Sequence, residues 1–150
     1  MEVLVVVLII GILTSVALPQ YQKAVAKARL ANVKNYVSAL KQAEEVYYST
    51  HNTYTTDLSL LDVDLNCQLV ADTSVLSCDD YLFIDVIGGA LQLGTSYINA
   101  YYCPHQNKSW NSCITENEFI YTVWLDESSS PGAISCGGRT DFGKAICKNP

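Results

Sequence analysis

Formal charge is scarce in this chain of 150 residues, and none lies between residues 3 and 22. Only 16% of the residues are Asp, Glu, Lys or Arg, whereas an ordinary soluble domain has roughly 25%. The hydrophobic residues make up 49% of the chain. They offset the entropy lost on folding, which excludes an intrinsically disordered chain. The length accommodates one domain with a hydrophobic core and excludes two.

Basic charge is also rare in the C-terminal part of the chain. Residues 20–41 contain five basic and no acidic side chains, whereas from residue 42 onward there are four basic and 14 acidic ones, a net charge of −10. The sequence therefore divides into an apolar, a basic and an acidic zone. The overall net charge of −6 disfavours nucleic-acid binding, because the phosphate backbone would be repelled. We predict no nucleic-acid partner.

The sequence also lacks the common patterns of catalytic and metal sites. It has no phosphate-binding glycine loop and no Gly-x-Ser-x-Gly, and neither of its two histidines is near a plausible nucleophile in the sequence. Cys-x-x-Cys pairs are missing as well, which disfavours zinc. The acid pairs Asp62/Asp64 and Asp79/Asp80 could bind calcium, but neither follows the EF-hand pattern, and solvated acidic loops are the simpler interpretation. We predict no enzyme, no cofactor and no metal site.

What the chain does have is an apolar N-terminal segment. Residues 3–18 read VLVVVLIIGILTSVAL, and these sixteen residues form roughly 24 Å of helix, slightly short of an independent membrane span. A signal peptide is the alternative, because residues 15–17 resemble a cleavage site, but the basic residues that precede such a segment are missing. A helix that is apolar on every side could be buried only in a core larger than a chain of this length can form. We therefore predict insertion in a membrane or burial among copies of the chain.

Three residues of this segment are candidates for a functional role. Glu2 is costly in hydrocarbon unless it is paired, which marks it as a functional residue. Gly11 and Pro19 weaken the helix, since glycine has a high backbone entropy and proline lacks the amide hydrogen. The stretch between them is the weakest part of the helix.

A second helical pattern follows Pro19. Its apolar positions are Ala26, Leu30, Val33, Val37, Leu40 and Tyr47, interrupted by Glu44. This spacing predicts an amphipathic helix to about residue 50 that packs on a sheet. The basic residues 23–29 form a solvated face, a contact for anionic lipid, or a surface that meets the acidic body of another subunit.

The segment EVLVVVLIIGILTSVALPQYQKAVAKARLANV resembles the N-terminal helix of type IV pilins and of their type II secretion relatives, the pseudopilins. The resemblance rests on an acid before a Val/Leu/Ile run, then Gly11-Ile12-Leu13, then ALPQY at residues 17–21, and it extends to about residue 32. It implies that the apolar half anchors the subunit in the inner membrane before assembly and becomes the filament core afterwards. It also implies that Glu2 neutralises the N-terminal amine of an adjacent subunit, and that residues 11–19 can lose helical structure in the filament.

One part of the family pattern is missing. The processing site of the family is a glycine before a methylated phenylalanine, a few residues ahead of the acid, whereas here Met1 directly precedes Glu2. Because the rest of the pattern is intact, we expect a precursor that begins upstream, and the alternative is a chain that the prepilin peptidase never meets. Methylation of an N-terminal phenylalanine therefore has no position in this sequence.

Beyond the helix, residues 48–66 are predicted to form a turn-rich connector, followed by strands at residues 81–87, 96–103 and 118–125. Together with the resemblance, these strands predict an α+β fold of the type IV pilin kind, in which a long N-terminal helix packs on an antiparallel sheet. The expected organisation is an apolar helix half at residues 1–19, an amphipathic basic half at 20–50 and a globular body at 51–150.

Six cysteines are confined to the acidic body: Cys67, Cys78, Cys103, Cys113, Cys136 and Cys147. An even number in a small body predicts disulfides and an oxidising, extracytoplasmic location. Fifteen connectivities are possible, and we expect the sequential pairs, which close three short loops of similar size. The last loop, CGGRTDFGKAIC, resembles the disulfide-bounded C-terminal region of pilins, and it is either a subunit contact or a stapled turn in which its glycines permit tight turns. Asn107 is in a glycosylation sequon.

These observations predict a structural subunit that polymerises into an extracellular type IV pilus as its major subunit. Its partners are then copies of itself, the inner membrane before assembly and the pilus assembly machinery, and its final location is the cell surface. A pseudopilin of a type II secretion system is the alternative, since it shares the same helix. A membrane-anchored periplasmic binding module is an alternative of another class.

Overall fold

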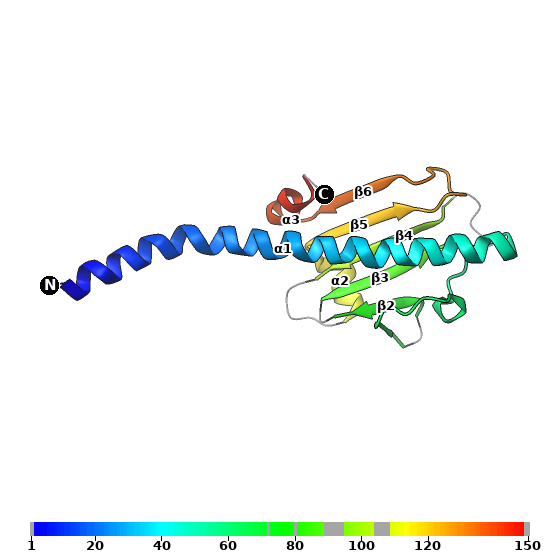
Figure 1. The fold of residues 1–150 in the computed structure, drawn as a ribbon, viewed down its shortest axis with the longest axis horizontal. Helices are drawn as coiled ribbons and strands as arrows, with labels where there is room; N and C mark the ends of the chain where they lie inside the picture. The colour runs from blue at the N-terminus through cyan, green and yellow to red at the C-terminus, as the bar shows by residue number, and fades with distance from the viewer. Residues whose placement is uncertain (1, 72, 80, 89–94, 104–108, 149–150) are drawn as a thin grey trace.

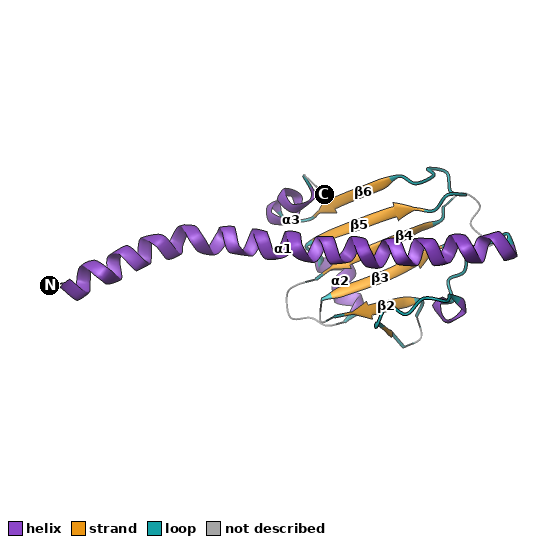
Figure 2. Ribbon diagram, in the orientation of Figure 1, coloured by secondary structure: helices purple, strands orange, loops and turns teal. Residues whose placement is uncertain are grey.

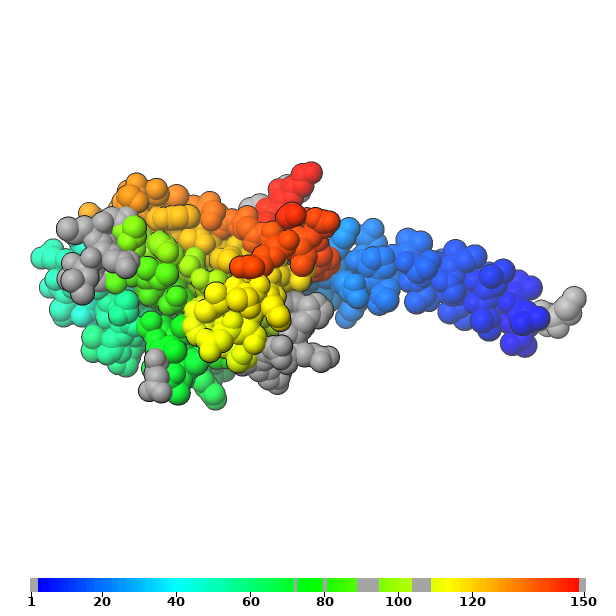
Figure 3. All heavy atoms as spheres, turned by 180° about the vertical axis from the view of Figure 1, so that it is seen from behind, coloured from blue at the N-terminus to red at the C-terminus, as the bar shows by residue number. Residues whose placement is uncertain are grey.

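The computed structural model describes residues 2–71, 73–79, 81–88, 95–103 and 109–148. Its first element is a single helix, α1 (Glu2–His51), of 50 residues. The C-terminal half of α1 lies across a sheet, whereas the N-terminal half projects freely from the body and curves gently (Figures 1 and 3). The described chain is therefore a globular head on a helical stalk.

The sheet has six antiparallel strands in sequential order. They are β1 (Gln68–Leu69), β2 (Val75–Cys78), β3 (Leu82–Ile87), β4 (Tyr97–Tyr102), β5 (Phe119–Trp124) and β6 (Ile134–Gly138). Three short helices complete the fold: the 3-10 helix η1 (Leu58–Leu60), α2 (Trp110–Glu116) and α3 (Asp141–Cys147). One face of the sheet carries α1, and α2 lies on the other side (Figure 2). The predicted α+β architecture is confirmed.

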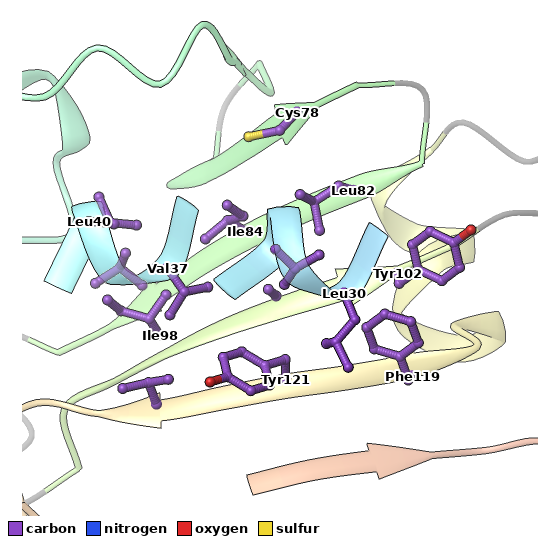
Figure 4. Close-up of a cluster of buried hydrophobic side chains, with 14 of the residues drawn as sticks. Leu30, Val37, Leu40, Cys78, Leu82, Ile84, Ile98, Tyr102, Phe119 and Tyr121 are labelled. Atoms are coloured by element: carbon purple, nitrogen blue, oxygen red, sulfur yellow. The ribbon is translucent and has the colours of Figure 1, made fainter. Parts of the chain in front are cut away.

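The core forms where α1 crosses the central strands. Leu30, Val37 and Leu40 of α1 point towards Ile84 and Ile98 of β3 and β4 (Figure 4). The predicted apolar stripe is buried from Ala26 to Leu40 and half-buried at Tyr47. The helical spacing in the sequence therefore identified the face that packs on the sheet.

The connector begins later than predicted. The helix does not end at residue 48 but continues through His51, whose ring stacks on Tyr47 with the ring centroids 4.1 Å apart. It ends there because the next residue, Asn52, has a left-handed φ of 53°; the backbone N–H of Asn52 donates to the carbonyl of Tyr48 at 2.8 Å. Asparagine tolerates this conformation, which is common just after a helix.

The predicted strands correspond to β3, β4 and β5, but β1, β2 and β6 were missed. These strands lie at the two sides of the sheet and are short or glycine-containing. They are held by antiparallel pairing with the neighbouring strand, as where Ser135 of β6 lies opposite Thr122 of β5. The helices α2 and α3 were also missed, although Ser109 and Thr140 are serine and threonine N-caps of the usual kind.

Three disulfides join sequential cysteines. Cys67–Cys78 ties the connector to β2, Cys103–Cys113 ties the end of β4 to α2, and Cys136–Cys147 ties β6 to α3. Each closes a short loop and so restricts the unfolded chain.

The last loop is not a simple stapled turn, because it contains most of β6 and all of α3. A Cβ on Gly138 would lie 2.2 Å from the backbone of Gly143, and one on Gly143 would lie 2.0 Å from the carbonyl oxygen of Glu118. The expectation that these two glycines serve tight turns was therefore wrong. They allow α3 to pack directly against the backbone of β6 and of the residue before β5.

Candidate assembly surface

The most unusual surface of the protein is the projecting half of α1. Every residue from Val3 to Gln20 is exposed, and the large apolar side chains among them are 51–75% exposed. By length and composition, α1 is the one helix in the described ranges able to cross a bilayer. A contiguous apolar surface of this size requires a cover of lipid or protein.

The polar groups in this half are compatible with an apolar cover. The hydroxyl of Thr14 donates to the carbonyl of Ile10 at 2.7 Å, and the hydroxyl of Ser15 donates to the carbonyl of Ile12 at 2.7 Å. Both hydroxyl hydrogens are therefore satisfied within the helix, which lowers the cost of removing water.

Three predicted assembly residues lie on this stalk. Glu2 is in the first turn of α1, Gly11 is in its exposed apolar part, and Pro19 is inside the helix. A Cβ placed on Gly11 would meet no atom within 4 Å, so packing inside the described subunit does not require glycine there. The six predicted cysteines lie in the body, and Asn107 falls outside the described residues.

A polar network attaches the other half of α1 to the body. The hydroxyl of Tyr54 donates to the Glu45 carboxylate, at 3.0 Å from Oε2, and accepts the backbone N–H of Glu127 at 3.1 Å. The backbone N–H of Asp126 donates to Glu45 Oε1 at 2.9 Å. Lys41 Nζ donates to Asp126 Oδ1 at 2.6 Å. The end of the helix is thus held to the connector and to the loop after β5.

Glu44 is the buried charge of this region. It is 0% exposed, and its Oε2 accepts the backbone N–H of Thr55 at 3.1 Å. Its Oε1 has no hydrogen-bond partner among the described residues. Burial is the main reason that the pKa of Glu44 is raised to about 7, and the neighbouring Glu45 adds to this effect. The only sign in the sequence that this carboxyl is buried was that Glu44 occupies a position of the apolar stripe.

Arg29 shows which part of the basic zone belongs to the body. Its guanidinium lies 4.1 Å from the ring centroid of Tyr81 and donates to the hydroxyl of Tyr102 at 2.5 Å. The hydrogen bond to Tyr102 is the main reason that the pKa of Arg29 is raised. Arg29 is therefore an internal contact between α1 and the sheet, whereas Lys23 and Lys27 remain exposed.

The described residues contain a groove beside the stalk but no cluster of metal-ligating side chains. No group of three or more His, Cys, Asp or Glu side chains in those ranges is arranged to hold a metal ion. A groove of about 560 Å³ lies where α1 leaves the body and is lined by Tyr21, Val25, Arg29 and Phe142, among others. Its walls are mostly apolar and aromatic, which suits packing against another apolar surface.

Comparisons with known proteins point to bacterial fibres. Residues 19–73, which include the second half of α1, the connector and β1, match the family described as "Type IV minor pilin ComP, DNA uptake sequence receptor". The chain is also similar to Fimbrial protein Q of Moraxella bovis, with 25% identity over 135 residues, or 87% of this chain and 86% of that protein. No solved structure matches the chain.

Proposed function

We propose that this chain, which belongs to the type IV pilin family, polymerises into an extracellular type IV pilus and is its major subunit. The observation that carries the proposal is the apolar stalk of α1, where every residue from Val3 to Gln20 is exposed. Such a stalk fits two environments in succession. It anchors the subunit in the inner membrane before assembly and packs among stalks of other copies in the fibre.

The stalk supplies a mechanism for assembly. The pilus machinery extracts the subunit from the membrane, and apolar burial among many copies gives the fibre its cohesion. Glu2 sets the axial position by pairing with the N-terminal amine of an adjacent subunit, since a lone carboxylate is costly in an apolar core. Residues 11–19 lose helical structure as the stalks pack, which Gly11 and Pro19 favour. No catalytic step is assigned to the subunit.

The body would coat the fibre and face the medium. The disulfides Cys67–Cys78, Cys103–Cys113 and Cys136–Cys147 suit an oxidising, exposed location. The periplasm is oxidising as well, so the disulfides fit both a surface pilus and a periplasmic pseudopilin. Glycosylation at Asn107 would add to the coat of a surface pilus.

Electron microscopy of fibres sheared from native cells tests the proposal. Helical fibres that contain this chain by peptide mass spectrometry, with the stalks at the centre, are the expected result. If the chain stays in the envelope fraction and no fibre contains it, the pilus proposal is wrong. The remaining candidates are then the pseudopilin and the membrane-anchored binding module.

DNA binding is a second candidate function, because the matching family is described as a DNA uptake sequence receptor. The net charge of −10 from residue 42 onward opposes it, so binding would have to use the lysines of α1. Fluorescence anisotropy of labelled duplex DNA with the full chain in neutral detergent tests this function. Saturable binding that weakens with salt supports it, and no binding at low salt rejects it.

A further inference from the structure

Three lysines of α1 form a basic surface, the lysine stripe, made of Lys23, Lys27 and Lys34. At 100° per residue these positions lie within about 40° of one another around the helix. Lys23 and Lys27 are exposed and Lys34 is half-buried. None of the three forms a salt bridge or hydrogen bond within the described residues. Lys41, on the same flank, differs because it pairs with Asp126 at 2.6 Å.

The stripe borders a groove on the β6 side of α1. This groove has a volume of about 390 Å³, and its lining includes Lys34, Lys41, Tyr121 and Ile134. Ile134, on the outermost strand of the sheet, is 59% exposed. The lysines thus stand beside an open apolar surface, a combination typical of protein interfaces.

An acidic surface lies on the other flank of α1. The acidic connector consists of Asp57, Asp62 and Asp64, all exposed, with Leu60 between them at 56% exposure. Asp57 accepts hydrogen bonds from Ser59, and Asp64 from the backbone of Asn66, but none of the three carboxylates contacts a cation within the described residues. Hydrogen bonds of this kind do not neutralise the carboxylates.

The two charged surfaces face opposite directions. Asp62 lines a second groove with Ala39 and Ala43 of α1, and at 100° per residue these two residues lie about 140° and 180° around the helix from Lys34, on the flank opposite the lysines. In Figure 1, β6 and β2 are on opposite sides of α1, and the connector runs on the β2 side. One subunit therefore cannot pair its own stripe with its own connector.

We propose that the lysine stripe of one subunit binds the acidic connector of a second copy. The inference rests on the proposed pilus function, which brings copies side by side. Two stripes repel each other, so the contact joins different patches. Because these patches lie on opposite flanks of α1, two copies cannot form both contacts with each other at once, and the contact does not close into a two-fold dimer. Such a head-to-tail contact repeats from copy to copy, and it yields a helical fibre when its rotation does not close a ring.

The positions of the patches also set the stagger between the two copies. The stripe ends at Lys34, whereas the connector lies beside residues 39–46 of α1. Pairing Lys34 or Lys27 with Asp62 therefore displaces the neighbour along its helix by about 10 to 30 Å, at 1.5 Å per residue. Because the charges are exposed, the contact weakens with salt.

Carbodiimide cross-linking of wild-type fibres tests the contact directly, because this reagent joins amines to carboxylates without a spacer. We expect cross-linked peptides that join Lys27 or Lys34 to Asp57, Asp62 or Asp64 in fibres and not in detergent-dispersed subunits. The internal pair of Lys41 and Asp126, 2.6 Å apart, is the positive control in both samples. Fibres that give only the internal cross-link overturn the proposal.

Charge reversal with rescue is the second test. We expect K27E/K34E and D62K/D64K each to reduce the fibre yield about tenfold, and the combination of all four to restore it to within about twofold. The matched control is K144E/K148E, which makes the same charge change on exposed lysines at the C-terminal end. Circular dichroism and disulfide mapping verify that each variant folds, and the cross-linking test does not depend on them.

Other results separate the possible failures. If the wild-type chain forms no fibres, the proposed pilus function fails and the contact fails with it. If fibres form normally from K27E/K34E, only the contact is wrong. Loss of binding to phosphatidylglycerol vesicles by a variant that still forms normal fibres would assign the stripe to anionic lipid instead.

Discussion

The two halves of α1 differ in what covers their apolar side chains. In residues 3–18 the large apolar residues point in all directions and are more than half exposed. In residues 26–40 they occupy one face, and that face is buried on the sheet. The second half is therefore stabilised by the sheet, and the first half is left for the partners that the proposed function assigns to it. Substitutions in the first half should affect assembly, and those in the second half should affect folding.

The largest expected effect on assembly comes from Glu2→Ala. Without the carboxylate, the N-terminal amine of the adjacent subunit is left unpaired in an apolar core, and we expect the fibre yield to fall more than about tenfold. The body should fold normally, as shown by its near-ultraviolet circular dichroism. The control is Glu116→Ala on exposed α2, which should assemble normally. A normal fibre yield from Glu2→Ala would reject the docking role.

A matched pair of leucines tests the contrast between the halves. Leu40→Ala removes a side chain that is 0% exposed and should lower the free energy of unfolding of the body by about 2–5 kcal/mol. Leu8→Ala, at a position 64% exposed, should leave it unchanged. Urea unfolding of the full chain in detergent measures both variants. Equal effects would contradict the assignment of the two halves to different partners.

Glu44 should make the stability of the body depend on pH. Its pKa is raised from 4.5 to about 7 in the folded protein, so the folded state binds the proton more tightly than the unfolded chain does. Stability should therefore be greatest below pH 4.5 for this group, fall by on the order of 2–4 kcal/mol as the pH rises to about 7, and then level off. Glu44→Gln should remove this dependence and be more stable at pH 8. If the slope persists in this variant, Glu44 is not its source.

The smallest expected effect concerns the network that holds the end of α1. Tyr54→Phe removes the hydroxyl that bonds Glu45 and the backbone of Glu127. We expect a loss of about 1–2 kcal/mol in the free energy of unfolding. Tyr36→Phe is the control, because the Tyr36 hydroxyl has no hydrogen bond within the described residues. A similar loss in both variants would mean that the hydroxyl network is not the cause.

Local periodicity predicted the elements with the strongest patterns. The apolar spacing from Ala26 to Leu40 predicted the buried face of α1, and the alternating or apolar segments predicted β3, β4 and β5. The outer strands β1, β2 and β6 are only two to five residues long and β6 contains glycines. Their own sequence patterns are therefore weak, and their stability comes from pairing with the adjacent strand.

The candidate site shows the same division. The stalk with Glu2, Gly11 and Pro19 could be recognised from the sequence, because its pattern is local. The network of Glu45, Tyr54 and Asp126 could not, because its members lie up to 81 positions apart and meet only when α1 is on the sheet.

By itself, the sequence determined that the first half of the helix needs an external partner and that the second half needs a sheet. Both follow from the number and angular distribution of apolar side chains, which do not depend on the rest of the fold. Only the tertiary structure decided which charges are used internally. It places Arg29 on Tyr81 and Tyr102 and pairs Lys41 with Asp126, while Lys27 stays exposed. Electrostatic contacts act over a few ångströms in space, so separation along the chain does not predict them.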